Sequence, residues 1–233
     1  MADTFSIALL WDIDGTLLHT GRAGIFALED AARDVLGSPP NLKNLPTAGL
    51  TDVEIAMGIV RQAGREPAAD IVNRFLRAYE KYLPSALTKK TGQVMPGVRA
   101  ILDRVAQRDD VLSLLLTGNT RAGARAKLIH YGIDHYFTEG AFADGTPDRR
   151  SIARRALDIV RQRQPAFPLE RIYVIGDTPH DVHCGKAIGA RTVAVASGEF
   201  SEGDLRALDP WWVVPALPSP DGFFEHVMPR VVR

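Results

Sequence analysis

Four short apolar runs recur along the chain, each bounded by residues that favour turns. Their side chains are apolar at successive positions, which is typical of strands that are buried on both faces and usually parallel. Segments with helical periodicity separate the runs, and this alternation predicts a doubly wound, Rossmann-like α/β fold with a parallel sheet. The predicted strands are Ser6–Trp11, Val111–Leu116, Ile172–Ile175 and Thr192–Ala196, and the predicted helices are Val98–Arg108, Arg121–Tyr131, Arg149–Gln164 and Asp181–Ile188.

The stretch between the first run and Pro96 has a helical pattern and contains no convincing strand. Two apolar stripes in it repeat with the spacing of helix faces, and between them Thr51 and Glu54 have the spacing of a capping box for a helix that ends near Ala63. We therefore predict an inserted α-helical cap domain at residues 19–93, within a core domain formed by residues 1–18 and 94–233. The stripes are Ile25, Leu28, Ala32, Val35 and Leu36, and Ile71, Phe75, Ala78, Tyr79, Tyr82 and Leu83.

Composition argues against several classes of protein. Lys plus Arg and Asp plus Glu number 28 each, so the chain lacks the net positive charge that attracts nucleic acids or anionic membranes. No apolar stretch approaches the ~18 residues that a membrane-spanning helix needs. No secretion signal is recognisable, and the single cysteine, Cys184, cannot form an internal disulfide. We expect a cytoplasmic monomer or homodimer with no nucleic-acid or membrane partner.

The first apolar run leads directly into two carboxylates, Asp12 and Asp14, which are followed by Gly15. Ionised acids at the end of a buried strand are costly unless a cation or solvent exposure compensates for their burial. Gly15 lets the backbone turn sharply and point its amides at an anion. An ordinary turn or a calcium loop uses the same residue types, although the apolar strand before Asp12 disfavours a calcium loop.

Two later strand ends carry similar groups. The second predicted strand ends in Thr117, Gly118 and Asn119, whose hydroxyl and amide groups are donors for phosphate oxygens, although the same residues also suit a turn and a helix N-cap. The third predicted strand leads to Asp177 and Asp181. Hard cations such as Mg²⁺ prefer oxygen ligands, so Asp177 is a candidate ligand and Asp181 a second ligand or support, unless Asp181 is only an N-cap.

Taken together, these motifs resemble those of the haloacid dehalogenase superfamily of phosphohydrolases. The family has a D-x-D-G-T strand end, a later strand ending in Thr or Ser, a basic residue, and a G-D-x-x-x-D strand end, which this chain matches at Asp12–Thr16, Thr117 and Gly176–Asp181. The helical insertion after the first motif is similar to the small cap of the phosphoglycolate phosphatase-like branch. The resemblance covers nearly the whole chain.

The resemblance implies a Mg²⁺-dependent phosphatase that acts on a small phosphorylated metabolite. Asp12 would be the nucleophile that forms an aspartyl-phosphate, and Asp14 the general acid and base. Mg²⁺ would be held by Asp12, the backbone carbonyl of Asp14 and Asp177, with Asp181 in support. Thr117, Gly118 and Asn119 would bind the transferring phosphoryl group.

One element departs from the family pattern, because the basic residue between the second and third motifs is usually lysine. No lysine lies between Lys127 and Lys186. Arg149, or else Arg150, stands where a basic residue is expected, and arginine keeps the charge while binding phosphate through two parallel N–H groups. We favour Arg149, although two arginines on a solvated helix face would look the same.

Several alternatives remain open at this stage. A phosphomutase of the same branch would use the same acids, and a non-catalytic binding module would keep the fold without the chemistry. A haloacid dehalogenase is disfavoured by Asp14, which the metal-free dehalogenases lack. We assign no catalytic role to His19, Thr51, Asp52 or Cys184.

Overall fold

The computed structural model describes residues 5–37, 42 and 47–228. Its centre is a six-stranded sheet in the order β5-β4-β1-β6-β7-β8, in which every neighbouring pair is parallel. The predicted α/β fold with a parallel sheet is therefore confirmed. The strands are β1 (Ile7–Trp11), β4 (Val111–Leu116), β5 (Gly140–Ala141), β6 (Ile172–Gly176), β7 (Arg191–Val195) and β8 (Trp212–Val214).

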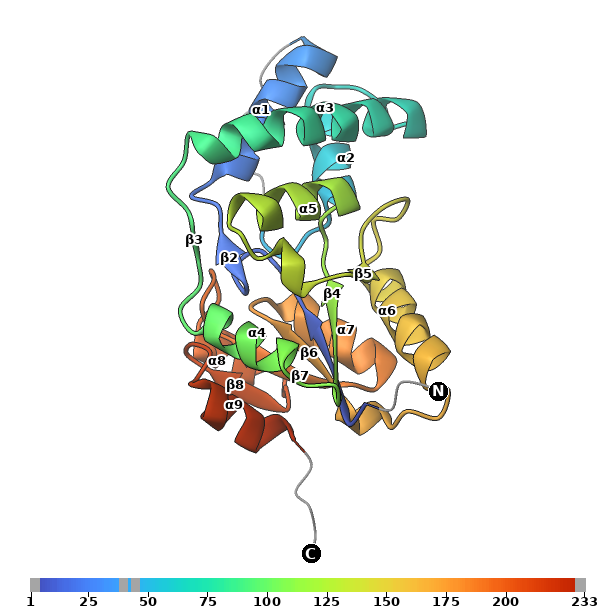
Figure 1. The fold of residues 1–233 in the computed structure, drawn as a ribbon. Coiled ribbons are helices and arrows are strands. Elements are labelled where there is room, and N and C mark those ends of the chain that lie inside the picture. The colour runs from blue at the N-terminus through green and yellow to red at the C-terminus, as the bar shows by residue number, and fades with distance from the viewer. Residues whose placement is uncertain (1–4, 38–41, 43–46, 229–233) are drawn as a thin grey trace, which may run out of the picture.

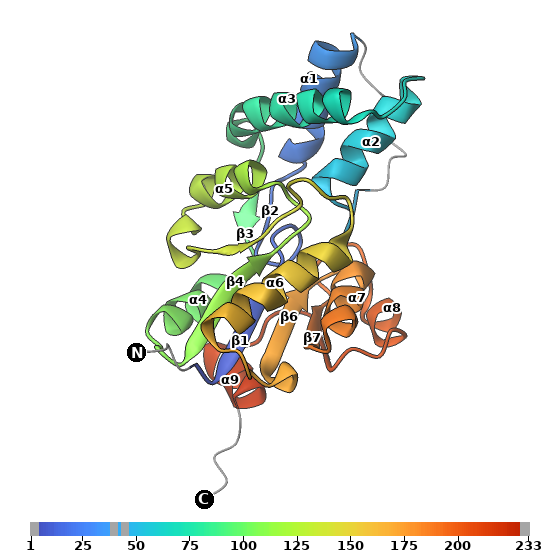
Figure 2. The ribbon, with the colours of Figure 1, turned by 90° about the vertical axis from the view of Figure 1, so that its right-hand side faces the viewer.

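Helices cover both faces of the sheet, as the unbroken apolar runs require. Side chains of β1 alternate between the faces, so Leu9 and Trp11 join one apolar cluster and Ala8 and Leu10 join the other. The first face is covered by α4 (Val98–Ala106), α5 (Arg121–His130) and α9 (Pro220–Val227), and the second by α6 (Arg149–Arg163) and α7 (Pro179–Ile188). Figure 2 shows α6 and α7 side by side in front of the strands.

Three further helices, which we call the helical insertion, lie beyond the carboxyl ends of the strands (Figure 1). They are α1 (Ala23–Leu36), α2 (Asp52–Gln62) and α3 (Ala69–Thr88), and α1 and α3 pack against each other. Thr51 and Glu54 form the predicted capping box at the start of α2. The central residues of both predicted stripes are buried, including Leu28, Ala32, Phe75 and Leu83. Their apolar cluster continues onto the sheet face that α6 and α7 cover.

The insertion is joined to the rest of the chain by a two-stranded antiparallel ribbon of β2 (Leu18–His19) and β3 (Gln93–Val94). The expectation that this region contains no strand was therefore wrong, because two-residue strands carry no recognisable period. The ribbon is tightly packed: a Cβ on Gly21 would lie 2.2 Å from the carbonyl oxygen of Thr91. The proposed domain boundaries at 18/19 and 93/94 fall within this ribbon, and the division into two domains stays a prediction.

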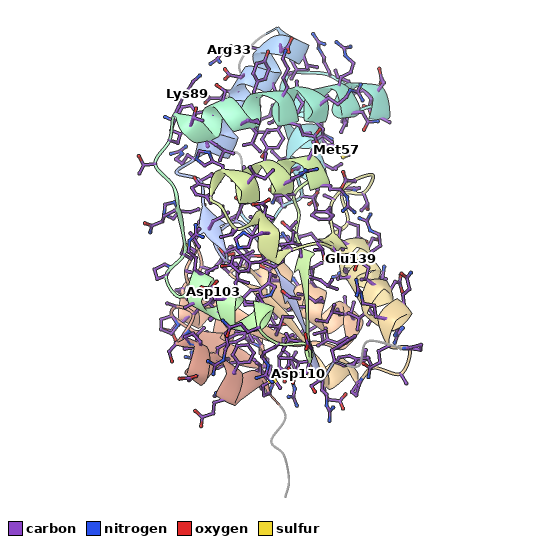
Figure 3. The ribbon with its side chains drawn as sticks, in the orientation of Figure 1. Arg33, Met57, Lys89, Asp103, Asp110 and Glu139 are labelled. Carbon is purple, nitrogen blue, oxygen red and sulfur yellow. The ribbon has the colours of Figure 1, made fainter. Side chains whose placement is uncertain are left out.

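The residues labelled in Figure 3 show in which direction the strands run. Asp110, immediately before β4, lies at the end opposite Arg33 and Lys89 of the insertion. The strands therefore run toward the insertion. The loops that follow β1, β4 and β6 lie at the end of the sheet nearest to it. No helix in the part of the chain that the structure describes is both long and apolar enough to span a membrane.

Short elements differ most from the sequence prediction. The edge strand expected within residues 210–220 is β8, but the tail after it contains α9, and a further helix, α8 (Glu202–Arg206), precedes it. At the opposite edge, β5 has only two residues. Ser201 caps α8 and Ser219 caps α9, and of these two capping residues only Ser219 lies in the proline-rich segment.

Candidate active site

The three motif-bearing strands are neighbours in the sheet, with β1 between β4 and β6. The backbone N–H of Asp12 continues the ladder by donating to the carbonyl of Ile175 at 2.9 Å. A cavity of about 560 Å³ opens at these strand ends, and it is lined by Asp12, Asp14, Asn119 and Asp177. Its opposite wall consists of residues of the helical insertion, among them Ile25, Leu28, Ile55 and Tyr79.

Three buried carboxylates gather at the floor of this cavity. Oxygens of Asp12, Asp177 and Asp181 all lie within 4.8 Å of one another. Burial, together with repulsion from Asp181, raises the pKa of Asp12 to about 7 and that of Asp177 to about 8. Such crowding favours protonation unless a cation is bound, and the donor set consists of the hard oxygens that Mg²⁺ prefers. The residues present therefore fit a divalent cation between Asp12 and Asp177.

Glycines enclose Asp177 and fix its position. A Cβ on Gly15, which has a φ of +82°, would lie 2.2 Å from Oδ2 of Asp177, and a Cβ on Gly198 would lie 1.8 Å from the same atom. On the other side, the hydroxyl of Thr16 donates to Oδ1 of Asp177 at 2.9 Å. No side chain larger than hydrogen fits at Gly15 or Gly198 without moving this carboxylate.

Arg149 is buried beside the carboxylates, whereas Arg150 is exposed. Its Nη2 atom lies 2.6 Å from Oδ1 of Asp181 and 3.6 Å from Oδ2 of Asp12, and Nη1 donates to the carbonyl of Gly49 at 3.0 Å. Burial opposes the charged form, but the two acids outweigh it, so the pKa of Arg149 is raised and the side chain stays charged. Of the two arginines, the structure thus brings Arg149 to the motif acids.

Both oxygens of Asp181 are engaged within the protein. Oδ1 accepts from Arg149, and Oδ2 accepts from the backbone N–H and the hydroxyl of Thr178 at 3.0 and 2.7 Å. The N-cap of α7 is Thr178, and Asp181 is the third residue of the helix, so the alternative that made Asp181 the N-cap was wrong. Its place in this network favours a supporting role over direct coordination.

Asp14 is more exposed than the three buried carboxylates, with 43% of its side chain accessible. Its Oδ2 accepts from Nδ2 of Asn119 at 2.8 Å, and the same amide donates to the hydroxyl oxygen of Thr117 at 3.0 Å. The backbone N–H of Asn119 also donates to Thr117. The helix that follows is capped by Thr120, so capping does not explain Thr117 or Asn119.

Residues 49–52, which we call the clasp segment, attach the insertion to the strand ends. The backbone N–H of Asp52 donates to the carbonyl of Gly118 at 2.7 Å, and the Asp52 carboxylate accepts from the backbone N–H of Thr120 at 2.7 Å. The hydroxyl of Thr51 donates to the carbonyl of Pro147 at 3.2 Å. These bonds close the cavity on one side.

Sequence reasoning missed two residues of this site. Lys127 of α5 is buried, and its Nζ forms an ion pair with Oδ2 of Asp14 at 2.5 Å. Sequence analysis gave Asp52 no role in the site, but its carboxylate accepts a hydrogen bond from the backbone N–H of Thr120. Burial raises the pKa of Asp52 to about 6. The only signal for Lys127 was its place ten residues after Thr117, which puts it on the helix that begins at the second motif.

Two other residues considered from the sequence, Cys184 and His19, are not among the residues that line the cavity. Cys184 is buried, its thiol donates to the carbonyl of Arg149, and burial raises the pKa of the thiol to about 11, in agreement with an inert core cysteine. His19 is exposed in the β2–β3 ribbon and is not among the residues that line the cavity.

The solved structures that are similar to nearly the whole chain include the following three. A hydrolase from Pseudomonas syringae has a TM-score of 0.69 at 17% identity, over 95% of this chain and 97% of its own. A predicted phosphoglycolate phosphatase from Haemophilus somnus has a TM-score of 0.66 at 19% identity, over 91% of this chain and 94% of its own. CbbY from Rhodobacter sphaeroides, in complex with phosphate, has a TM-score of 0.65 at 16% identity, over 93% and 95%. At these identities the likeness establishes the fold alone.

Sequence comparison is more decisive for the family. No curated protein sequence matches the chain significantly. A family model described as haloacid dehalogenase-like hydrolase, however, matches residues 9–186, which include all three motifs, the helical insertion and Arg149. The resemblance drawn from the motifs is confirmed: this chain belongs to the haloacid dehalogenase-like hydrolase family.

Proposed function

We propose that this protein is a Mg²⁺-dependent phosphatase that hydrolyses a small phosphomonoester through an aspartyl-phosphate on Asp12. One observation carries the proposal: a buried carboxylate pair, Asp12 and Asp177, lies beside the buried cation of Arg149, while the more exposed Asp14 lines the same cavity. This arrangement supports the proposal that a nucleophile, a cation site and an acid act around one point. The family and the fold support the same reading.

In the first half of the reaction, a carboxylate oxygen of Asp12 attacks phosphorus and the bond from phosphorus to the leaving oxygen breaks. Asp14, in its acid form, gives its proton to that oxygen, so the product leaves as a neutral alcohol. Arg149 and the groups of Thr117, Gly118 and Asn119 hold the oxygens of the transferring phosphoryl group.

In the second half, Asp14 accepts a proton from water as the water oxygen attacks phosphorus, and Asp12 is released as a carboxylate. Asp12, the backbone carbonyl of Asp14 and Asp177 would hold Mg²⁺. When bound, Mg²⁺ neutralises phosphate charge, so that an anionic nucleophile can approach an anionic substrate. Asp181 holds Arg149 in place through its 2.6 Å contact.

The helical insertion is proposed to act as a cap that limits substrate size. The cavity of about 560 Å³ suits a small phosphorylated metabolite, and the clasp segment closes one side of it. The β2–β3 ribbon is the proposed hinge, because it carries both connections to the insertion. A cytoplasmic location, suggested by the one unpaired cysteine, belongs to the same proposal.

The test is release of phosphate from p-nitrophenyl phosphate and from a panel of phosphorylated metabolites that includes phosphoglycolate, with Mg²⁺ and with EDTA. We expect Mg²⁺-dependent release that Asp12→Asn abolishes. Product analysis with sugar phosphates separates hydrolysis from phosphate return to the substrate, as in a phosphomutase. If purified wild-type protein releases no phosphate and Asp12→Asn changes nothing, the protein is a binding module instead.

A further inference from the structure

Lys127 stands out among the charged residues of the cavity because it is a buried lysine. Only 4% of it is exposed, and it is the one buried lysine in the part of the chain that the structure describes. Burying an ammonium group is costly, and replacing a buried ion pair by a well-packed apolar residue of similar volume is often neutral or stabilising. An uncharged residue of similar length would pack at this position without the free-energy cost of removing a charge from water. Stability alone therefore does not account for Lys127.

The contacts of Lys127 form a closed triangle with two residues of the motifs. Its Nζ donates to Oδ2 of Asp14 and to Oδ1 of Asn119, while Nδ2 of Asn119 donates to the same Oδ2 of Asp14. The hydroxyl of Thr117 fixes Asn119 in turn. Every side-chain hydrogen bond that Asp14 makes within the described residues thus goes to one oxygen, Oδ2, and Oδ1 is left for another partner.

The surroundings keep Lys127 charged. Burial alone would lower its pKa, but Asp14 and the Asp52 carboxylate of α2 outweigh burial, and the pKa is raised. Asp52 is itself fixed by the backbone N–H of Thr120, at the start of the helix that carries Lys127. A permanent cation is therefore held at one side of Asp14 by the insertion as well as by the core.

We propose that Lys127 is a positioning residue for Asp14: together with Asn119 it anchors Oδ2, so that Oδ1 faces the leaving oxygen of the substrate. This inference rests on the proposed phosphatase function and deepens it. A carboxyl group that rotates freely presents its proton in many directions, and a misplacement of about 1 Å lowers the rate of a step by up to roughly 10²-fold. The lysine would thus act through Asp14 without touching the substrate.

The test compares two substrates that differ in their need for an acid. The leaving group of p-nitrophenyl phosphate departs without protonation, whereas that of an alkyl phosphate monoester needs a proton. Lys127→Met should lower kcat/KM, which reports on the steps up to release of the leaving group, by roughly 10–10²-fold for the alkyl phosphate. The loss for p-nitrophenyl phosphate should be much smaller. Lys186→Met, on the exposed side of α7, is the control and should leave both substrates unaffected.

A second measurement connects the two residues. In the Asp14→Asn background, Lys127→Met should cause little further loss, because a residue that acts through Asp14 has nothing left to position. Equal losses of kcat/KM on both substrates, or additive losses in the double variant, would overturn the proposal. If Lys127→Met does not fold, Asn119→Ala removes the other side-chain donor to Oδ2 and keeps the backbone N–H of residue 119 for the phosphoryl group. The same two substrates are compared, and the same results support or overturn the proposal.

The outcome is separable from that of the proposed function. If wild-type protein hydrolyses neither substrate, the phosphatase proposal fails. A second outcome would refute only the role of Lys127. In that outcome the wild-type protein hydrolyses both substrates and Asp12→Asn is inactive, but the ratio of kcat/KM for the two substrates is the same in Lys127→Met as in the wild type.

Discussion

Gly198 lies directly against Asp177, so that a Cβ on this glycine would be 1.8 Å from Oδ2 of the carboxylate. The two residues come from the loops that follow β7 and β6, and their contact sets where a ligand oxygen of the proposed cation site can lie. Gly15 approaches the same oxygen from the loop after β1. The position of Asp177 is therefore fixed by the absence of side chains around it as much as by its bond with Thr16.

Gly198→Ala is expected to displace Asp177 and to lower Mg²⁺ affinity by roughly 10–100-fold, the usual effect of disturbing a group that orients a ligand. Isothermal titration calorimetry measures the affinity. Gly203→Ala in α8 is the matched control, because its Cβ would make only an ordinary contact at 3.6 Å with Ser201. Unchanged Mg²⁺ affinity in Gly198→Ala would place the cation away from Asp177.

Asp14→Asn should leave Mg²⁺ binding nearly intact, because only its backbone carbonyl is proposed as a ligand. Turnover should fall by roughly 10²–10⁴-fold, as expected when a general acid and base is lost. Calorimetry and steady-state kinetics on the same preparation separate the two effects. A loss of Mg²⁺ affinity comparable to the loss of turnover would contradict this assignment.

Arg149→Ala is expected to impair activity far more than Arg150→Ala. Removing Arg149 also leaves Asp181 and Asp12 without their buried cation, at a cost of about 3–5 kcal/mol in the free energy of unfolding. Urea denaturation measures that cost, and kcat/KM measures the activity. Arg150 is exposed and provides the control; a reversed ranking of the two variants would transfer the role to Arg150.

The stabilising effect of Mg²⁺ should depend on pH. Burial raises the pKa of Asp12 to about 7 and that of Asp177 to about 8, above the ordinary value of 3.8. Because these folded-state pKa values are raised, the metal-free protein loses stability as the pH rises from about 3.8 to about 7 to 8, above which both carboxylates are ionised in either state. Mg²⁺ replaces those protons, so it should raise the melting temperature more at about pH 8 than at about pH 6.

Thermal melting with and without Mg²⁺ at the two pH values provides the measurement. Asp177→Asn is the control, since it removes one proposed ligand and one of the two raised pKa values. The difference between the two pH values should shrink in that variant. An equal Mg²⁺ effect at both pH values in the wild type would show that the cation does not compete with these protons.

Gly118→Ala should loosen the clasp segment. A Cβ on Gly118 would lie 2.7 Å from the carbonyl oxygen of Leu50 and 3.1 Å from Nη1 of Arg149. Faster hydrogen exchange at residues 49–52, with little change in exchange at β1 and β4, is the expected result. Slow exchange retained at Asp52, whose N–H donates to Gly118, would show that the clasp segment tolerates the methyl group.

The four central strands could be predicted to within one residue, because each is a largely apolar run with turn residues at both ends. The motif acids could also be placed, since the carboxyl ends of adjacent parallel strands meet at one edge of the sheet. Arg149 was distinguishable from Arg150 only by its place at the start of a helix. The structure places it beside Asp12, although its role in the reaction is still a prediction.

Contacts between distant residues could not be predicted. Lys127 lies 113 residues after Asp14, and within α5 it resembles any lysine on a solvated helix. Asp52 follows an N-cap threonine, so local capping explained it well enough to hide its bond with Thr120. Strands β2, β3 and β5 have two residues each, too few for a period to be visible.

The β2–β3 ribbon has a consequence for how such a chain can diversify. Because the chain enters and leaves the three helices through two paired strands, the ends of the segment lie side by side at His19 and Gln93. A different set of helices, or a short turn, could be joined at the same two points without altering the strand order beneath. Under the proposed function, exchanging the helices at these two points would change selectivity for the alcohol portion of a substrate and leave the residues at the strand ends in place.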